Sequence, residues 1–344
     1  MVKILAIPIT IFIFMACLYV PLSHMELVYC HQVGFEQLKN TRFDYFIAAS
    51  GYEERSTYLI DNIEVKADNK IVLSFEDKKD LLFREKNDKC FEDKGFTFIE
   101  ESAGQTDRIN ILLADICNNS LRCENISILV DYSCMTKTWY AGILKYMTSH
   151  ELNIDSLELY FSYTSAVFTE PLRKEIKVLS TSPRGLLKAN VRPSKPRALI
   201  LGLGYEKLLT PHLIKNFESM TVFAFYTDPA YDNRYTERVM KNNRKILRSL
   251  PKDHICKYPI EDLKKTDALL TALSIKLRLN YHVAILPVGP KPFTLSSLLL
   301  ASRYPDIEVW SLDRRQSSES YSRTPLGEPL VCKILLSGDE EKYL

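Results

Sequence analysis

The chain has 344 residues, and 45 Lys and Arg against 43 Asp and Glu give it a formal net charge of +2. This balance excludes the broad positive surface that drives non-specific nucleic-acid binding, but not a local basic patch. A composition that is 46% hydrophobic and 26% charged excludes disordered and fibrous proteins, and the length indicates about two globular domains. Glycine is scarce, at 11 residues, so each glycine beside a strand end is informative.

Cysteine and histidine are dispersed along the chain. The eight cysteines form no CxxC pair and the six histidines lie apart, so the sequence predicts no metal site. A chain of this length builds its cores without disulfide bonds, which predicts free thiols in a reducing compartment. We therefore expect a cytoplasmic body.

The first 24 residues (1–24) form a separate hydrophobic segment. From Ile4 to Leu22 the chain carries no charge, and at about 1.5 Å per residue this stretch just crosses a hydrocarbon layer of about 30 Å. Three interpretations stay open: an uncleaved single-pass anchor, a cleaved signal peptide, and a start codon assigned too early, with Met25 as the internal start. We favour the anchor, which tethers the cytoplasmic body to a membrane.

Residues 40–178 are expected to form a first lobe of alternating strands and helices. This alternation is typical of βαβ units stacked around a parallel sheet. The expected strands are Phe43 to Ala49, Lys70 to Phe75, Phe96 to Ile99, Ile126 to Asp131 and Leu157 to Tyr163. The expected helices are Glu54 to Asn62, Asp77 to Asp93, Asp107 to Asn118 and Thr136 to Ser149.

Residues 197–344 repeat the same order of elements in a second lobe, after a Pro-containing linker at 179–196. Its expected strands are Ala198 to Leu203, Thr221 to Tyr226, Ile255 to Tyr258, Val283 to Pro287 and Ile307 to Leu312, with an additional edge strand over Leu330 to Leu336. Its expected helices are Lys207 to Phe217, Asn233 to Leu250, Ile260 to Leu279 and Phe293 to Arg303.

Two local matches suggest that one lobe is a copy of the other. The tripeptides Gly51-Tyr52-Glu53 and Gly204-Tyr205-Glu206 both follow the first strand of their lobe, and the segments from Ser127 and Val283 share a strand, a polar loop and a helix. The sequence thus predicts an α/β fold with two tandem Rossmann-like lobes. We expect mainly parallel sheets flanked by helices, arising by internal duplication and related by a pseudo-twofold axis.

Ligands of open α/β sheets collect at the carboxyl ends of the strands. After the first strands, both loops enter a helix whose N-terminal N–H groups are able to hold a phosphate. The candidate ligand residues here are Ser50, Gly51, Glu53, Arg55, Gly202, Gly204 and Glu206, with Asp228 after the second strand of the second lobe. The alternative is that the glutamates only complement helix dipoles and the glycines only permit tight turns.

The loops after the fourth strands supply the remaining candidates. Asp131 ends a strand and would act as a general base if burial raised its pKa, with Glu53 as its acid/base partner. The other candidate ligand residues are Ser133, Thr136, Lys137, Gly289 and Lys291, which could meet a ribose or a phosphate. The alternative is that Asp131 caps a helix and Lys291 is a surface charge.

One helix of the second lobe carries six basic residues at helical spacing. Such a face contacts nucleic acid, an anionic head group or an acidic partner, but a solvated outer face is the more common explanation, so nucleic acid is not favoured. The residues are Arg234, Arg238, Lys241, Arg244, Lys245 and Arg248.

The chain has no G-x-S-x-G motif, no G-x-x-x-x-G-K-[ST] loop and no evident catalytic triad. Paired loops at helix N-termini without a convincing nucleophile favour a binding protein for a nucleotide or related phosphorylated small molecule, such as a membrane-tethered sensor. One alternative is a transferase or hydrolase that acts on a nucleotide or nucleoside through Asp131 and Glu53. The other is a protein-interaction scaffold. No cofactor or oligomeric state is predicted.

Overall fold

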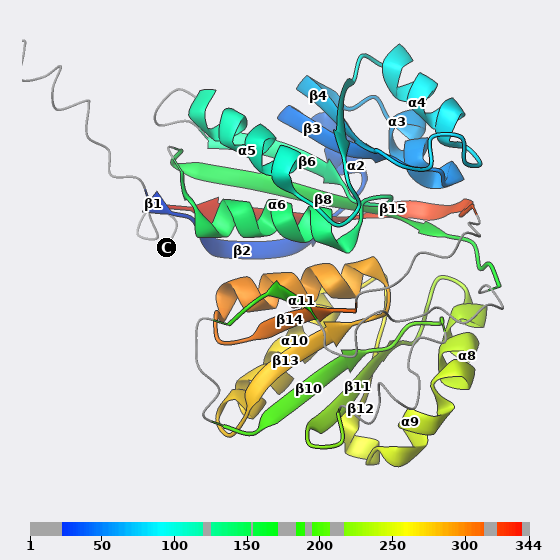
Figure 1. Cartoon of the computed structure of the whole chain (residues 1–344), viewed down its shortest axis with the longest axis vertical. Helices are drawn as coiled ribbons and strands as arrows, with labels where there is room; N and C mark the ends of the chain where they lie inside the picture. Colours follow the sequence, from blue (N-terminus) through cyan, green and yellow to red (C-terminus); the bar gives the residue numbers. More distant parts are fainter. Residues whose placement is uncertain are drawn as a thin grey trace, which may run out of the picture.

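A computed structural model describes residues 23–119, 125–152, 154–170, 184–189, 195–206, 217–312 and 322–338. This part of the chain has an α/β architecture with two large sheets of mostly parallel strands, each flanked by helices (Figure 1). We call each sheet with its helices a lobe. The expected α/β class is confirmed at this level.

The first sheet has the strand order β2-β15-β8-β6-β3-β4-β5. The strands from β8 to β5 in this order run parallel, and β15 and β2 run antiparallel to their neighbours. All five strands expected in the first lobe are present. The bounds are β2 Glu26–Val33, β3 Arg42–Ser50, β4 Lys66–Phe75, β5 Thr97–Glu101, β6 Asn125–Asp131, β8 Ser156–Ala166 and β15 Pro325–Ser337.

The helices of the first lobe are α2 Glu36–Asn40, the 3-10 turn η1 Glu54–Thr57, α3 Tyr58–Asn62, α4 Arg84–Asp93, α5 Asp107–Asn119 and α6 Lys137–Ser149. A small separate ladder joins β1 Ser23–His24 to β7 Glu151–Leu152. The helix expected from Asp77 begins only at Arg84, because Lys78 and Leu82 have positive φ angles of 61° and 48° that interrupt a right-handed helix. At the start of α6, the Thr136 side chain accepts a hydrogen bond from the Trp139 N–H and caps the helix.

The second sheet has the strand order β12-β11-β10-β13-β14-β9. Its bounds are β9 Arg184–Leu187, β10 Arg197–Gly202, β11 Thr221–Thr227, β12 Ile255–Tyr258, β13 His282–Pro287 and β14 Glu308–Ser311. Only β9 is antiparallel to its neighbour in this described sheet, and it lies inside the segment expected as a linker. The helices are α8 Asn233–Asn242, α9 Arg244–Ser249, the turn η2 Lys252–His254, α10 Leu263–Arg278 and α11 Lys291–Arg303.

Two helices of the second lobe differ from expectation. The single helix expected from Asn233 to Leu250 is divided at Asn243, where the backbone leaves the helical region and the side chain turns to the Gly204 carbonyl. The helix expected from Lys207 to Phe217 falls almost entirely on residues 207–216, which lie outside the described part of the chain.

Five parallel strands in each sheet share one order when they are numbered along the chain. The order is third, second, first, fourth, fifth: β5-β4-β3-β6-β8 in the first sheet and β12-β11-β10-β13-β14 in the second. The strand order therefore reverses between the first and fourth strands of both sheets. An origin by duplication stays a prediction, because a shared order alone does not establish descent.

The strand β15 lies in the first sheet, although its sequence position predicts a place in the second lobe. It is also an internal strand and not an edge strand, because it pairs with β8 on one side and β2 on the other. The run from Leu330 to Leu336 explains this position. Val331 packs into the core on one side of the sheet, and Ile334 and Leu336 pack into the core on the other, so both faces need cover.

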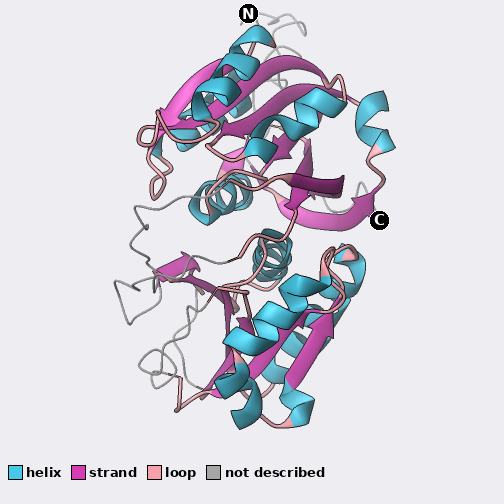
Figure 2. Cartoon of the chain, turned by 90° about the vertical axis from the view of Figure 1, so that its right-hand side faces the viewer, coloured by secondary structure: helices cyan, strands magenta, loops and turns pink. Residues whose placement is uncertain are grey.

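The two lobes share a continuous core. Helix α6 of the first lobe packs against α11 of the second, so helices lie between the two sheets (Figures 1 and 2). Trp139 from α6 and Phe293 from α11 belong to the same cluster of buried apolar residues. This packing fixes the loops at the ends of both sheets relative to one another.

The segment expected as a membrane anchor, Ile4 to Leu22, lies outside the described residues. Among the residues described, the helices are all too short or too polar to cross a bilayer. Met25 itself is buried in the core of the first lobe, 2% exposed.

Candidate functional site

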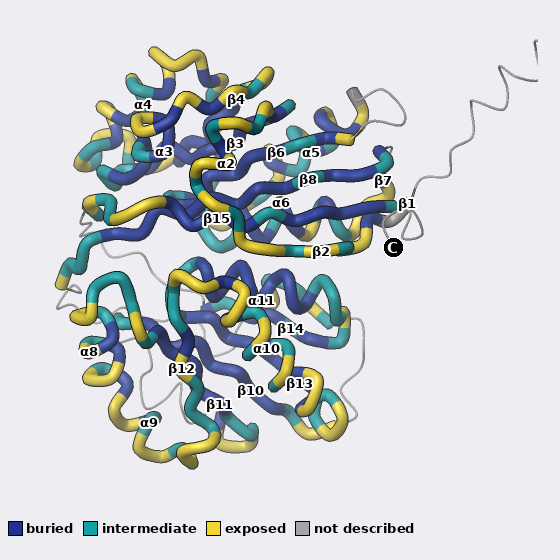
Figure 3. Tube along the Cα trace, turned by 180° about the vertical axis from the view of Figure 1, so that it is seen from behind, coloured by how far each residue is buried: buried dark blue, intermediate teal, exposed yellow. Residues whose placement is uncertain are grey.

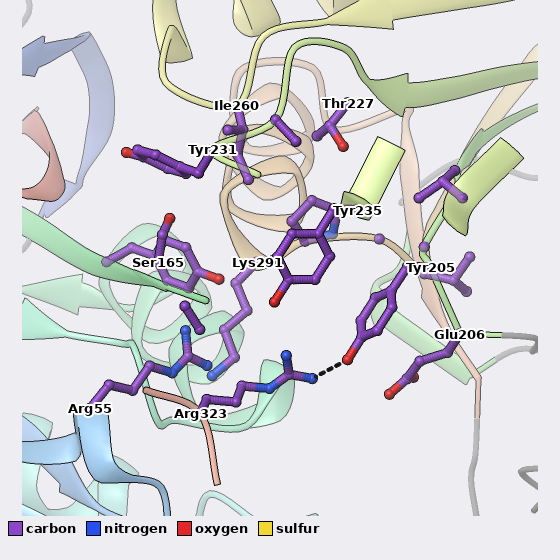
Figure 4. A pocket seen from close by; sticks show the side chains of 18 of the residues that line it. Arg55, Ser165, Tyr205, Glu206, Thr227, Tyr231, Tyr235, Ile260, Lys291 and Arg323 are labelled. Carbon is purple, nitrogen blue, oxygen red and sulfur yellow. Dashed lines mark hydrogen bonds between the residues drawn. The ribbon is translucent and has the colours of Figure 1, made fainter. Parts of the chain in front are cut away.

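A pocket of about 280 Å³ lies between the lobes, at the carboxyl ends of the parallel strands of both sheets (Figure 4). Strand β8 and the loop after β3 supply one wall, and the loops after β10, β11 and β13 supply the other. The lining residues are Glu53, Arg55, Lys137, Tyr163, Ser165, Ala166, Gly204, Tyr205, Glu206, Thr227, Ala230, Tyr231, Tyr235, Val239, Ile260, Val288, Gly289, Pro290, Lys291 and Arg323.

The pocket gathers about half of the residues that the sequence put forward. Those that line it are Glu53, Arg55, Lys137, Gly204, Glu206, Gly289 and Lys291. Those that lie outside its lining are Ser50, Gly51, Asp131, Ser133, Thr136, Gly202 and Asp228. The outer group has structural contacts instead, of which the helix cap by Thr136 and an ion pair of 2.8 Å between Asp228 and Lys257 are examples.

A largely buried ion cluster lines one side of the pocket. The Arg55 Nε lies 2.6 Å from one carboxylate oxygen of Glu53, and the Arg323 Nε lies 3.6 Å from the other. Arg55 also donates to the Thr164 carbonyl at 2.7 Å. Burial alone would raise the pKa of Glu53, but the positive charges of Arg55, Arg323 and Lys291 outweigh it and hold the pKa below its usual value. Glu53 is therefore ionised at neutral pH.

Helix α4 holds the loop that carries Glu53. The Asn87 side-chain amide donates to the carbonyls of Gly51 and Glu53, at 2.8 and 2.9 Å. The Gly51 N–H donates to the Ser56 hydroxyl, and the Ser50 hydroxyl donates to Asp88. Ser50 and Gly51 thus shape the loop from behind the pocket.

The N–H groups at the start of η1 already have partners within the chain. The Glu54 N–H donates to the Ser322 hydroxyl at 2.9 Å, and the Arg55 N–H donates to the Arg323 carbonyl at 3.2 Å. From the sequence we expect these amides to hold a phosphate. In the structure these amides donate instead to residues 322 and 323. The positive charge on this side of the pocket therefore comes from side chains and not from backbone amides.

Two lysines cross between the lobes. The Lys137 ammonium, at the start of α6, donates to the Pro287 carbonyl at the end of β13. The Lys291 ammonium, at the start of α11, donates to the carbonyls of Ser133 and Tyr132 just beyond β6, at 2.5 and 3.3 Å. Burial and then the positive charge of Arg55 lower the pKa of Lys291 to about 8. Lys291 is thus a part of the pocket wall and not a surface charge.

Asp131 lies behind the wall of the pocket. Its carboxylate accepts hydrogen bonds from the N–H and the hydroxyl of Ser133, at 3.0 and 2.5 Å. Burial raises the pKa of Asp131, in the direction that a general base requires, although the Ser133 hydrogen bonds oppose the shift. Because the carboxylate is turned to Ser133, it does not face a ligand in the pocket.

The glycines of the second lobe are explained by close backbone approach. A Cβ atom on Gly204 would lie 2.5 Å from the Val288 carbonyl oxygen, and one on Gly289 would lie 2.6 Å from the Leu203 carbonyl oxygen. A Cβ atom on Gly202 would meet the Phe293 ring at 2.4 Å. These contacts let the loops after β10 and β13 pack directly on each other beneath the pocket.

Sequence reasoning missed the aromatic part of the pocket. Tyr163, Tyr205, Tyr231 and Tyr235 line it, and the rings of Tyr205 and Tyr235 meet edge to face with centroids 5.1 Å apart. Tyr205 stands in the repeated Gly-Tyr-Glu tripeptide, which is a sequence signal for this wall of the pocket.

Arg323 was also missed. Its guanidinium donates to the Tyr205 hydroxyl at 2.9 Å, so it contacts residues of both lobes. No sequence signal places it there, because its position depends on the return of the chain to the first sheet.

The six basic residues of the expected long helix lie on α8 and α9, much of which is exposed (Figure 3). None of the six lines the pocket, although Tyr235 and Val239 of α8 do. Two of the six are paired with acids: Arg234 with Asp232 at 2.6 Å, and Arg238 with Glu170. These pairs reduce the positive charge that this face offers to nucleic acid.

Comparison with family models and with curated proteins does not assign the chain to a family. No family model matches the chain, and no curated protein matches it significantly.

Proposed function

We propose that this protein binds a nucleotide or a related phosphorylated small molecule in the pocket between its lobes. The observation that carries the proposal is the pairing of four cationic side chains with four tyrosines around one cavity. Arg and Lys are the residues that recognise phosphate, and tyrosine rings pack against bases and sugars. The pocket also lies at the carboxyl ends of parallel strands, where ligands of α/β sheets bind.

The proposal includes two Rossmann-like lobes derived by duplication. Three observations support it: the shared strand order, the repeated Gly-Tyr-Glu tripeptide, and a matched pair of asparagines. In the first lobe Asn87 donates to the Gly51 carbonyl at 2.8 Å, and in the second Asn243 donates to the Gly204 carbonyl at 2.8 Å. Each asparagine follows the second strand of its lobe and fixes the glycine after the first.

Binding is favoured over catalysis because neither predicted acid/base residue has the required environment. Glu53 is held in its ionised form by two arginines, and Asp131 is turned away from the cavity. A weakly basic carboxylate and an inaccessible one make poor proton carriers. A screen for ligands separates a binding protein or an enzyme from a scaffold, and an assay for turnover separates a binding protein from an enzyme.

The test is a thermal-denaturation screen of the full-length chain against nucleotides, dinucleotides, cyclic oligonucleotides and S-adenosylmethionine. A ligand at about 100 times its Kd should stabilise the fold by about 2.7 kcal/mol. The variant Arg323→Gln should lose most of this shift, whereas Arg244→Gln, an exposed arginine on α9, should retain it. If no compound shifts the melting temperature, the protein-interaction scaffold remains as the interpretation. Turnover of a bound compound would indicate an enzyme.

We also propose that the body lies in the cytoplasm and that a single-pass anchor over Ile4 to Leu22 tethers it to a membrane. Fractionation of the full-length chain beside a chain that starts at Met25 tests the anchor. We expect only the full-length protein in the membrane fraction, and equal solubility of the two would refute a tether.

A further inference from the structure

Lys291 presents its amine to the pocket without a direct carboxylate partner. Its side chain lines the cavity and reaches from the start of α11 toward Arg55 and Arg323 (Figure 4). Its nitrogen donates to two neutral groups, the carbonyls of Ser133 at 2.5 Å and Tyr132 at 3.3 Å. In the described part of the chain no carboxylate oxygen lies within 4 Å of this nitrogen. Lys291 therefore lacks the ion pair that keeps an enclosed lysine protonated.

Two carboxylates act on Lys291 from a greater distance. Glu53 and Asp131 are both within electrostatic reach and favour the charged form of the amine. Each has a direct partner of its own, because Glu53 pairs with Arg55 at 2.6 Å and Asp131 accepts two hydrogen bonds from Ser133. Their attraction is therefore weaker than that of an ion pair in contact.

Three features disfavour a positive charge on Lys291. Burial has the largest effect, and the charges of Arg55 and Arg323 add to it. Lys291 is also the first residue of α11, a helix of 13 residues, where the partial positive charge of the helix N-terminus opposes a cation. Together these features hold the pKa of Lys291 at about 8. About half of the molecules then carry a neutral amine at pH 8, compared with less than about 1% for an ordinary lysine.

A neutral amine in this position is a nucleophile. Lysines that are withdrawn from water or lie beside another cationic group attack carbonyl carbons in this way. A neutral amine has two N–H groups and one lone pair. The carbonyls of Tyr132 and Ser133 accept from the two N–H groups, which leaves the lone pair for a ligand in the pocket.

We propose that Lys291 forms an imine with an aldehyde or ketone bound in the pocket. The ligand class is a carbonyl compound with a flat ring, which suits the tyrosines of the lining, and a phosphate group. The phosphate in this class rests on the proposed function, whereas the imine does not.

The reaction requires no further reactant. The nitrogen of Lys291 bonds to the carbonyl carbon, and the carbonyl oxygen leaves as water with the two hydrogens of the amine. The imine nitrogen then takes a proton from solvent. Its single N–H can remain on the Ser133 carbonyl, which is the closer of the two acceptors.

The test uses pyridoxal 5′-phosphate, an aldehyde with an aromatic ring and a phosphate monoester, as the probe. The full-length chain is mixed with an equimolar amount at pH 8, and borohydride reduces each imine to a stable secondary amine. Peptide mass spectrometry then measures the modified fraction of each lysine. We expect at least about tenfold more modification at Lys291 than at Lys245, an exposed lysine on α9, because its neutral fraction is larger.

A conservative variant separates the imine from binding without a covalent bond. Lys291→Arg keeps a positive charge and N–H donors but has no amine, so the visible absorbance of the imine should not develop in this variant. The matched variant Lys245→Arg should develop it as the unmodified chain does. Absorbance that persists in Lys291→Arg would refute the assignment to Lys291.

The modified positions decide the remaining points. Equal modification of Lys291 and Lys245, or preferential modification of Lys137, would overturn the imine and leave the proposed nucleotide pocket standing. If pyridoxal, which has no phosphate, modifies Lys291 as efficiently, the imine stands and the phosphate part of the proposed function loses its support. If Lys291→Arg does not fold, the comparison of lysines within the unmodified chain makes the same decision.

Discussion

Lys137 and Lys291 each reach across the lobe boundary to the end of the other lobe's fourth strand. Lys137 donates to the carbonyl of Pro287, and Lys291 donates to those of Ser133 and Tyr132. Each lysine stands at the first position of the helix that follows its own fourth strand. These two hydrogen-bonding contacts across the lobe boundary link the two strand ends that form the base of the pocket.

Removal of the Lys137 charge should weaken the lobe boundary. Lys137→Met keeps the apolar stem but loses the hydrogen bond to Pro287, and a bond to a charged group contributes about 1.5–3 kcal/mol. The measurement is the free energy of unfolding from urea denaturation. Lys145→Met, an exposed position on the same helix, should change it by less than about 0.5 kcal/mol. Equal effects at the two positions would contradict a specific role for Lys137.

The glycines of the second lobe should not tolerate a side chain. Gly204→Ala and Gly289→Ala place a methyl group against a backbone carbonyl, at 2.5 and 2.6 Å, and backbone cannot move as a side chain can. We expect each to lower the free energy of unfolding by about 1–3 kcal/mol, as overpacking does. Gly34→Ala is the control, because a methyl group on Gly34 would have no other atom within 4 Å. A Gly204→Ala protein as stable as the control would refute the close approach.

Asn87 should affect both stability and ligand affinity. Asn87→Ala leaves the carbonyls of Gly51 and Glu53 without their partner, at a cost of about 1–3 kcal/mol, and frees the loop that positions Glu53. Asn62→Ala, which removes a single hydrogen bond from an exposed side chain, is the control. Denaturation measures the first effect and titration with the best nucleotide the second. Loss of stability with unchanged affinity would show that the loop does not position the site.

Binding of a phosphate monoester should be coupled to a proton. Because the pKa of Lys291 is about 8 in the unliganded protein, about half of its amines are neutral at pH 8. A dianion favours the charged amine and raises this pKa, so binding at pH 8 takes up protons, while the ligand, with a second pKa of about 6, is already ionised. Affinity should therefore fall as the pH rises above 8. Calorimetry in two buffers of different ionisation enthalpy measures the uptake.

Several other ionisable groups lie near Lys291, and a variant identifies the group that takes up the proton. The groups that face it are Glu53, whose pKa is lowered, Arg55 and Arg323, which stay charged, Lys137, Asp131, and Cys134, whose pKa burial and the charge of Glu53 raise to about 12. The Lys291→Gln variant should bind without proton uptake at pH 8. Uptake that persists in this variant would assign the proton to another group.

The parallel strands could be predicted because a short apolar run rich in β-branched residues rarely forms anything other than a strand in an α/β protein. The five parallel strands of each sheet follow from such runs, as in Ile126 to Asp131, which matches β6 to within one residue. The start of α4 was not predictable, because the left-handed residues Lys78 and Leu82 are not glycines and give no signal. The strand β2 was missed, since an edge strand with a mixed, half-exposed pattern resembles a loop.

The site was predictable only as far as local sequence determines it. Glu53, Gly204 and Lys291 were found because loops at strand ends are where α/β proteins bind ligands. Arg323 was not, because a residue 268 positions from Arg55 in the sequence reaches Glu53 only after β15 has joined the first sheet. The tyrosines were missed, because only the meeting of the lobes turns them toward a cavity.

The place of β15 has a consequence for the order in which the protein is made. Every strand of the second sheet leaves the ribosome before residues 325–337, so the second sheet can form while the β8 edge of the first is still unpaired. The lobe that is synthesised first is therefore completed last. Arg323 arrives together with that final strand, so a nascent chain acquires the full charge of its pocket only when the first sheet closes.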